Sequence, residues 1–569
     1  MTRCGVRRES PSAGASGKLP RLLSLALLVA LSLSAPPERY DLILENGRVV
    51  DGTGAPWFRA DVAILKDRIA AVGDLQGALA RERIDVHEHF VAPGFIDMLG
   101  QSPLFILVDP RAESKIRQGI TSELSGEGMS VAPMTKAVSA DFENRLSVYE
   151  VHVDWTDLAS YWKRLRAARP AINLGTIVGA AQVRAAVMGF GQGPPTPEQL
   201  LRMQIEVRKQ MRQGAFGLGS ALLYPPGSYA TTDELVALAQ AAAGWGGLYA
   251  THIRDEEEGV LDALDEAIRI GKRARIPVEI WHLKVAGKKN WGRMAEVVKR
   301  IELARADGVD IAADVYPYLA GLNNLTADLP GWAMADGTEA MLGRLRNSEQ
   351  RQLIEVEVTN GWADADMPER IRVAACVLPE AKPAEGKTLA QLAKERGVSP
   401  AAALVDLALA DHGNTDVIRF WVDEPDLRLA MRQPWTSFDT DAAALAVDGP
   451  FANEGTHPRA FGTMARVLGT YVREEGLLGV EEAVRKMTSL PAARLGLADR
   501  GLLRAGMAAD VVVFDGATVA ATSTYDNPRQ YPLGVELVLV NGQVVLRDGI
   551  RTEARPGRPL LHPVPPELR

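Results

Sequence analysis

The chain has 569 residues, enough for about two to four compact units or for one large barrel with additions. Hydrophobic residues make up 47 % and charged residues 24 %, which is typical of a soluble globular protein. That composition excludes a disordered chain, a collagen-like chain, a disulfide scaffold and a multi-span membrane protein. Acidic residues outnumber basic ones by 72 to 64 and no long basic block is present, so we expect no nucleic-acid partner.

The N-terminus carries the pattern of a secretory signal. Basic residues precede an apolar run over residues 22–33, and small residues and then Pro36-Pro37 follow that run. We assign residues 1–35 to the signal and expect a periplasmic or secreted protein. The run is shorter than the roughly 20 residues that cross a bilayer, so no stable membrane span is expected after cleavage. An uncleaved anchor is the disfavoured alternative. Cys376 would be the only cysteine of the mature chain, which excludes an intrachain disulfide.

The two ends of the chain carry similar strand–turn–strand patterns. Apolar runs flank Asn46-Gly47 near the start and Asn541-Gly542 near the end, and each pattern predicts a β-hairpin. A further buried strand is expected at Asp510–Phe514. We therefore predict one small composite β-sandwich domain built from residues 38–90 and 500–550, with the middle of the chain inserted between these two segments.

Short apolar strands alternate with helical stretches over residues 91–499, which predicts an α/β protein with a (β/α)₈ barrel like that of triosephosphate isomerase. The eight predicted strands are Gly94–Met98, Thr121–Leu124, Ala171–Val178, Ala215–Leu218, Leu248–His252, Val278–His282, Val309–Val315 and Trp435–Asp441. The long gap before the last strand predicts an inserted subdomain at residues 331–433. The proline-rich tail, residues 551–569, is predicted to be an extended arm.

Four side chains that can bind a metal lie where predicted strands end. His252 closes the fifth strand and His282 closes the sixth, so two neighbouring strands would present imidazoles side by side. Glu127 follows the second strand and Asp441 ends the eighth. Active sites of such barrels lie at the carboxyl ends of the strands, and two histidines with a carboxylate suit Zn²⁺ with one position open for water. The alternative, two unrelated buried histidines, is disfavoured by their matching placement.

A second pair of histidines occurs in His87-Glu88-His89. Alternation along a strand would place both imidazoles on one face. This segment, however, precedes the first predicted barrel strand, so we expect no catalytic metal there.

A series of short motifs follows in a fixed order along the chain. They include VAPGFID at 91–97, YPPG at 224–227, ATHIR at 250–254, HLK at 282–284, THPR at 456–459 and TSLPA at 488–492. In this order they resemble the amidohydrolase superfamily and, within it, the N-acyl-D-amino-acid deacylases (D-aminoacylases). The resemblance covers about residues 38–550 and implies a barrel with a composite β domain, a zinc cofactor and a small N-acyl amino acid as substrate.

The resemblance also implies roles for the residues at the strand ends. His252 and His282 match the two barrel histidines on the more buried metal of the family. Glu127 falls where deacylases often have a ligating cysteine, and a carboxylate there can still bind Zn²⁺. Asp441 matches the catalytic aspartate, which would act as general base and then general acid for a zinc-activated water.

Three further residues fall in segments that resemble substrate contacts. Lys284, Tyr224 and Arg459 are the expected partners of the substrate carboxylate and carbonyl. Charge-assisted bonds from Lys284 or Arg459 would fix the orientation of the substrate.

The first predicted barrel strand departs from the family pattern. The resemblance places a His-x-His pair there, where this chain has Met98-Leu99-Gly100-Gln101. Leu99 cannot bind a metal and Gln101 would be a poor ligand, so we expect about one Zn²⁺ per chain and no normal second site. Asp439 shares a strand face with Asp441. It could act on Asp441 by like-charge repulsion, supply a substitute ligand, or be a buried carboxylate satisfied by backbone or arginine.

Three functional interpretations remain. The favoured one is an exported mononuclear zinc deacylase of N-acyl-D-amino acids or related D-residue compounds. A cyclic amide or imide hydrolase, hydantoinase-like or dihydroorotase-like, is disfavoured because those chemistries commonly rely on two metals. A non-catalytic binding protein on the same fold is disfavoured because the set of four residues is complete. The acyl group, the stereochemistry and the oligomeric state are left open by the sequence.

Overall fold

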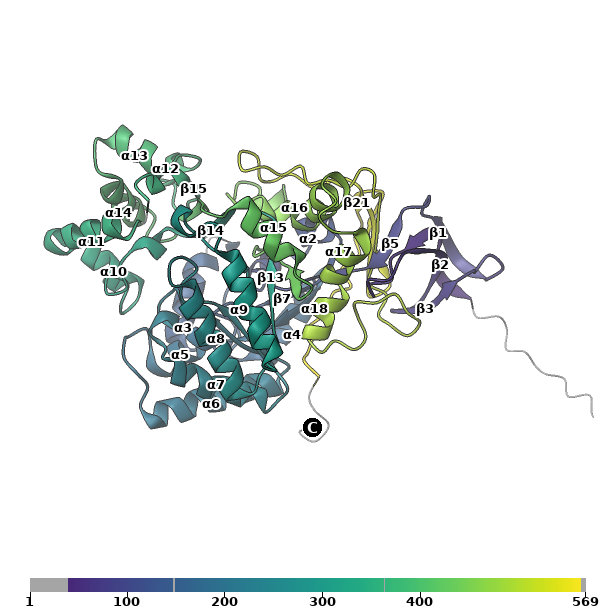
Figure 1. Ribbon diagram of the computed structural model, residues 1–569, viewed down its shortest axis with the longest axis horizontal. Coiled ribbons are helices and arrows are strands. Elements are labelled where there is room, and N and C mark those ends of the chain that lie inside the picture. The colour runs from purple at the N-terminus through teal and green to yellow at the C-terminus, as the bar shows by residue number, and fades with distance from the viewer. Residues whose placement is uncertain (1–38, 147–148, 363, 564–569) are drawn as a thin grey trace, which may run out of the picture.

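The computed structural model describes residues 39–146, 149–362 and 364–563, so the predicted signal at 1–35 lies outside it. The described elements fall into a parallel barrel, a β sheet to which both chain ends contribute, and an inserted subdomain (Figure 1). Within these ranges no helix combines the length and the apolar character needed to cross a membrane.

The barrel is built from eight parallel strands in chain order. They are β6 (Phe95–Asp97), β7 (Ile120–Ser125), β8 (Asn173–Thr176), β10 (Gly217–Ala221), β11 (Leu248–His252), β12 (Val278–Ile280), β13 (Ile311–Val315) and β17 (Thr436–Phe438). The short β9 (Val178–Gly179) follows β8 and pairs with β10. A parallel bridge between Gly100 and Ala442 joins the last strand to the first. The α/β class and the predicted barrel are thereby confirmed.

Helices between the strands cover the outside of the barrel. Up to the last strand they are α1 (Phe105–Val108), α2 (Glu113–Ile116), α3 (Lys136–Leu146), α4 (Leu158–Ala168), α5 (Ala180–Met188), α6 (Pro197–Arg212), α7 (Thr232–Ala243), α8 (Val260–Ala274), α9 (Met294–Ala306) and α15 (Glu424–Arg432). After it come α16 (Arg459–Arg466), α17 (Val480–Met487) and α18 (Ser489–Arg494). The start of α6 is encoded locally, since Thr196 and Gln199 form a capping box around Pro197.

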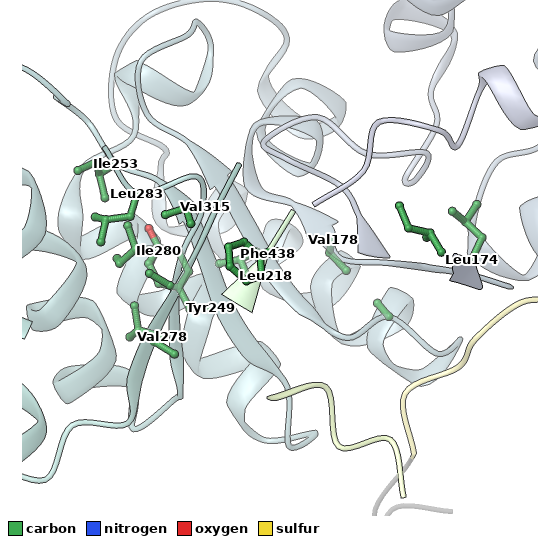
Figure 2. Packing of buried hydrophobic residues seen from close by; sticks show 14 of the residues in the cluster. Leu174, Val178, Leu218, Tyr249, Ile253, Val278, Ile280, Leu283, Val315 and Phe438 are labelled. Atoms are coloured by element: carbon green, nitrogen blue, oxygen red, sulfur yellow. The ribbon is translucent and has the colours of Figure 1, made fainter. Parts of the chain in front are cut away.

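The barrel strands are buried on both faces, which explains their continuous apolar runs. Every residue of β11 and β13 is buried. Side chains from separate strands, among them Leu218, Tyr249, Val278 and Phe438, belong to one apolar cluster (Figure 2). The polar residues that emerge at the strand ends are therefore held by a rigid, packed frame.

Strands from both chain ends share one nine-stranded sheet. From the start come β1 (Tyr40–Val49), β2 (Phe58–Leu65), β3 (Arg68–Gly73), β4 (Ala80–Asp85) and β5 (Phe90–Pro93), and from the end β18 (Val511–Phe514), β19 (Val535–Val540), β20 (Gln543–Arg547) and β21 (Ile550–Arg551). β5 pairs with β1 on one side and with β18 on the other, so it joins the two segments. One apolar cluster, with Leu44 and Ile64 from one end and Val511 and Leu539 from the other, packs beneath this sheet.

One of the two predicted hairpins is wrong. Asn541-Gly542 does turn the chain from β19 to β20, with Val540 opposite Gln543. Asn46-Gly47 instead lies inside β1, which continues along β2 with a bulge between Leu44 and Gly47. Asn46 adopts a φ of 61°. An Asn-Gly pair permits positive φ in a bulge as readily as in a tight turn, so the local signal does not distinguish the two.

The insertion has a core of its own. It contains β14 (Ala320–Asn324), β15 (Ile371–Ala375), β16 (Asp416–Phe420), α10 (Thr338–Arg346), α11 (Ser348–Gly361), α12 (Met367–Arg370), α13 (Leu389–Arg396) and α14 (Pro400–Ala410). Its helices lie at the end of the molecule opposite β1–β3 (Figure 1). The borders expected at 331 and 433 shift to about 320 and 420, because β14 pairs with β16 while α15 packs against α9 and β17 of the barrel.

The described part of the tail runs extended beside the barrel. Leu174 of β8 donates its N–H to Arg558 and accepts one from Leu560, at 3.1 and 2.8 Å. His562 donates its backbone N–H to Gly214. Residues 564–569 of the predicted arm lie outside the described part.

A buried lysine ties the first and last barrel strands together. Lys115 on α2 is fully buried, and its Nζ lies 2.7 Å from Asp97 Oδ2 and 3.0 Å from Glu123 Oε2. It also donates to Thr440 Oγ1 and to the Ala442 carbonyl, at 2.7 and 2.8 Å. Burial alone would lower the pKa of Lys115, but Asp97 and Glu123 outweigh it and raise the pKa, so the ammonium stays charged.

We expect Lys115→Ala to lower the apparent free energy of unfolding by about 3–5 kcal/mol, because it leaves buried carboxylates without their cation. Urea titration followed by circular dichroism measures the change. Lys272→Ala is the control, since its pair with Asp307 at 3.3 Å is largely exposed and should contribute under about 1 kcal/mol. Equal effects of the two substitutions would contradict this account of barrel closure.

Candidate metal centre

Glu127, His252 and His282 meet at the carboxyl ends of the barrel strands. Glu127 Oε1 lies 2.8 Å from His252 Nδ1 and 3.1 Å from His282 Nε2. The two imidazole rings are nearly perpendicular, with centroids 4.4 Å apart. One ligand atom from each residue lies within 4.8 Å of the others. Two nitrogens and a carboxylate oxygen match the three protein ligands of hydrolytic zinc sites, so these residues fit a zinc ion with one position open.

The backbone around these side chains adopts uncommon conformations. His282 has a φ of 38° and Asp441 a φ of 41°. Such positive values in non-glycine residues concentrate at functional sites, where the surrounding structure compensates the strain. Here Asp314 accepts the His282 N–H at 2.5 Å. Gly126, with a φ of 111°, lets the chain turn just before Glu127. A Cβ atom on Gly126 would lie 2.5 Å from the Ile177 carbonyl oxygen, so the turn requires glycine.

Glu256 lies behind both histidines and was not predicted from the sequence. Its Oε1 is 3.1 Å from His282 Nδ1 and its Oε2 is 3.6 Å from His252 Nε2. A carboxylate placed as Glu256 is beside His282 sets the tautomer and orientation of a ligating imidazole, whereas His252 Nε2 has no hydrogen-bond partner among the described residues. The sequence does contain a signal for this contact, because Glu256 follows His252 by only four residues. The acidic run Asp255–Glu258 is also typical of a solvated helix start, so the sequence does not single out Glu256.

Charge interactions within the cluster are strong. Burial opposes ionisation of Glu127, but hydrogen bonds from His252 and His282 hold the pKa of that carboxyl well below its usual range. Burial and nearby Lys284 lower the pKa of His282, whereas Glu256 and Glu127 raise it, and the result is about 10. A metal takes the lone pair that this proton occupies, so cation binding here releases a proton.

Asp441 lines the same cavity as the centre and contacts Arg459. Its Oδ2 is 2.8 Å from Arg459 Nη2. The guanidinium stacks over the Tyr316 ring at 4.4 Å. Among the described residues, Nε and Nη1 of Arg459 have no hydrogen-bond partner. His457, two residues earlier, accepts the Arg459 N–H through Nδ1, and burial holds the pKa of His457 well below its usual value.

Gln101 connects the two carboxylates of the site. Its Nε2 donates to Glu127 Oε2 at 2.7 Å and to Asp441 Oδ1 at 3.1 Å. Leu99 is fully buried in an apolar cluster with Trp281. The Leu99 side chain therefore offers no ligand atom, and the Gln101 amide is engaged by two carboxylates.

Asp439 is not a substitute ligand in this arrangement. Its side chain is fully buried, and the potential ligand group within the described chain contains only Glu127, His252 and His282. Nor do backbone or arginine groups among the described residues satisfy it; its side chain contacts the carboxyl of Asp314, and a hydrogen bond between the two requires that one of them be protonated. Burial and then the charge of Asp441 raise the pKa of Asp439 to about 7.

The centre opens into a cavity of about 910 Å³ between the barrel and the insertion. All seven predicted site residues line it: Glu127, Tyr224, His252, His282, Lys284, Asp441 and Arg459. Tyr224 packs edge-on against His252, with ring centroids 5.5 Å apart. Lys284 differs from the expectation of a free substrate contact, because its Nζ lies 2.6 Å from Glu256 Oε1 and 2.7 Å from His282 Nδ1.

The remaining lining of this cavity includes both apolar and polar side chains. Six of its apolar members, here called the apolar wall, are Leu104, Phe105, Val108, Met129, Val131 and Leu445. Three cations line the cavity within the described ranges, and each has an acidic partner: Lys284 with Glu256 at 2.6 Å, Lys382 with Glu385 at 3.1 Å and Arg459 with Asp441 at 2.8 Å.

The second histidine pair lies away from this centre. His87 is largely exposed beside Asp85, and His89 Nδ1 bonds to Glu536 at 2.8 Å in the composite sheet. Neither is part of the ligand group recorded for the described residues.

Comparison with known proteins identifies similar sequences and structures. A model of the amidohydrolase family matches residues 82–546. A D-aminoacylase of Alcaligenes xylosoxydans xylosoxydans is 36 % identical over 525 residues, covering 92 % of this chain and 97 % of the relative.

Two solved structures are similar over the same span. The N-acyl-D-glutamate deacylase of Bordetella bronchiseptica, complexed with zinc and a phosphonate that mimics the tetrahedral intermediate, is 33 % identical with a TM-score of 0.78. A D-aminoacylase described as having a binuclear metal centre, activated by one metal and attenuated by a second, is 35 % identical with a TM-score of 0.78. Each match covers 92 % of this chain and 100 % of the other.

Proposed function

This chain belongs to the amidohydrolase family, and we propose that it is a zinc-dependent deacylase that hydrolyses the linear amide of N-acyl-D-amino acids. The observation that carries the proposal is the convergence of Glu127, His252 and His282 within 4.8 Å at the mouth of the barrel. The products would be a carboxylic acid and a free D-amino acid, with one water consumed.

Glu127, His252 and His282 would hold the cation, and Glu256 would orient the His282 imidazole through its 3.1 Å contact with Nδ1. A bound zinc ion supplies a Lewis acid for the amide carbonyl and lowers the pKa of a water molecule to about 7. We propose about one zinc per chain. The other candidate ligand position, at Leu99 and Gln101, offers no side chain that zinc prefers.

Asp441 would move the proton. Its carboxylate accepts a proton from the attacking water and returns it to the amide nitrogen as the C–N bond breaks. The 2.8 Å contact from Arg459 Nη2 holds Asp441 Oδ2 in place.

Arg459 is the better placed of the two predicted cations for the substrate carboxylate. Two of its nitrogens have no partner within the described chain, whereas Lys284 is engaged by Glu256 and His282. We therefore assign the α-carboxylate to Arg459, and we assign Lys284 to orientation of His282. Tyr224, beside His252, is the proposed contact to the amide carbonyl.

The apolar wall supports a preference for a large apolar D side chain. A second carboxylate in the substrate would enter a cavity whose described cations are already paired, and an unpaired buried charge is costly. We expect kcat/KM for N-acetyl-D-leucine to exceed that for N-acetyl-D-glutamate by about 10–100-fold and to exceed that for N-acetyl-L-leucine by at least as much. Ninhydrin detection of released amino acid measures all three.

The three substrates distinguish failure of the proposed function from failure of the proposed side-chain preference. No release from any N-acyl-D-amino acid in the presence of zinc would contradict the proposed function, whereas faster release of D-glutamate would contradict only the apolar preference. Leu104→Lys should raise the relative rate on N-acetyl-D-glutamate by adding a cation to the wall. Leu201→Lys, on the exposed face of α6, is the matched control and should not change the ratio.

Hydrolysis of cyclic amides is the alternative reaction. Two zinc ions per chain, together with turnover of a hydantoin, would favour it. Export to the periplasm or medium is a separate proposal that rests on residues 1–35, and cell fractionation with and without those residues tests it.

A further inference from the structure

We propose that Gln101 is a positioning residue that holds Glu127 and Asp441 with one amide group and restricts the centre to a single divalent cation. Nε2 of Gln101 carries two hydrogens. It donates one to Glu127 Oε2 at 2.7 Å and the other to Asp441 Oδ1 at 3.1 Å.

This amide completes a continuous row of contacts. Glu127 directs Oε1 to the imidazoles of His252 and His282 and Oε2 to Gln101. Asp441 directs Oδ1 to Gln101 and Oδ2 to Arg459. Bonds from N–H donors to carboxylates are roughly twice as strong as those between neutral groups. Both oxygens of both carboxylates are thereby oriented before substrate binds.

The position of Gln101 is itself fixed by the closure of the barrel. Its backbone N–H donates to Ala442 at 3.0 Å, and the Gly100 N–H donates to Leu124 at 2.7 Å. A Cβ atom at Gly100 would lie 2.0 Å from Glu123 Cδ, so the chain passes here in close contact with the second strand. The amide therefore reaches the two carboxylates from a rigid strand end.

The same arrangement disfavours a second cation between Glu127 and Asp441. A cation there would need the carboxylate oxygens that now accept from Gln101, and it would lie close to the positive charge of Arg459. Leu99, the other residue of this strand end, brings no donor atom. Gln101 thus places a neutral amide between the two carboxylates, where a charged side chain would attract a second cation.

Zinc counting tests the restriction to one cation without any substrate. Elemental analysis after equilibration with excess zinc should find about one zinc in the wild type and about two in Gln101→Glu, which replaces the amide by a third carboxylate. Gln76→Glu adds the same charge at an exposed position and should stay at one. Two zinc ions in the wild type, or one in Gln101→Glu, would overturn the proposal.

Kinetics test the positioning role, which rests on the proposed function. Gln101→Leu should keep one zinc and lower kcat by about 10–100-fold with KM changed less than about threefold, because misplacement by an ångström costs about that much in rate. Gln118→Leu also removes a buried amide, which donates to Ser114 and Ala460 at 2.7 and 2.9 Å and accepts from Met464 at 3.1 Å, but lies outside the cavity lining. It should leave kcat unchanged.

An unchanged kcat in Gln101→Leu, or an equal loss in Gln118→Leu, would overturn the positioning role. If the wild type hydrolyses no N-acyl-D-amino acid, the proposed function fails, and the zinc counts still decide whether Gln101 limits the centre to one cation. If Gln101→Leu does not fold, the number of zinc ions bound by Gln101→Glu still decides whether Gln101 limits the centre to one cation.

Discussion

Replacing Asp441 by asparagine is expected to lower kcat by about 10²–10⁴-fold while leaving the zinc content unchanged. The amide keeps the shape of the side chain, but its single oxygen can accept from only one of Gln101 and Arg459, and it cannot accept a proton from water. Because the three proposed ligands are separate residues, the metal should remain. Steady-state kinetics on N-acetyl-D-leucine, together with elemental analysis of the same sample, measure both quantities.

Asp448→Asn is the matched control for Asp441→Asn. Asp448 also contacts an arginine, at 2.7 Å from Arg111 Nη1, but its side chain is largely exposed. We expect this variant to retain wild-type kcat. Normal turnover in Asp441→Asn would show that another group moves the proton, and loss of zinc from it would place Asp441 among the ligands instead.

Replacing His282 by alanine is expected to remove bound zinc, from about one per chain to well under one, and to abolish activity. The variant loses one of three ligands and also the bonds of the His282 ring to Glu256 and Lys284. Two protein ligands do not make a hydrolytic zinc site. Elemental analysis after dialysis measures the zinc, and adding a chelator to the wild type should produce the same loss of turnover.

His87→Ala serves as the control for His282→Ala. His87 is 74 % exposed and belongs to the His87-Glu88-His89 segment, which precedes the barrel. This variant should keep both zinc and activity. Full zinc occupancy in His282→Ala would refute the proposed ligand set, and zinc loss in His87→Ala would move the metal to the composite sheet.

Residues at the strand ends were largely predictable from the sequence. The apolar runs at Leu248–His252 and Val278–His282 are local signals, and a parallel barrel brings equivalent ends together whatever the packing details. The structure places His252 and His282 with ring centroids 4.4 Å apart. Glu127 followed from the same rule. The resemblance to deacylases added the role of Asp441.

Features that depend on distant contacts were not predictable. Asn46-Gly47 is typical of a tight turn. Because β1 pairs with both β2 and β5, these two residues lie in a bulge within β1 instead. Glu256 lies in an acidic run that is typical of a solvated helix start, and only the fold brings it close to both imidazoles. The border of the insertion depended on the pairing of β14 with β16, across about a hundred residues.

The sequence by itself determined the alternation of strands and helices, the apolar faces and the order of the reactive residues, because these follow from short-range patterns. Tertiary structure alone decided how the reactive groups are connected. Glu127 meets His282 across 155 residues and Gln101 meets Asp441 across 340. A hydrogen bond depends on ångström distances and on direction, and the closure of the barrel sets both. From the sequence alone, Gln101 is identified only as a poor metal ligand. In the fold, its amide connects the carboxylates of Glu127 and Asp441.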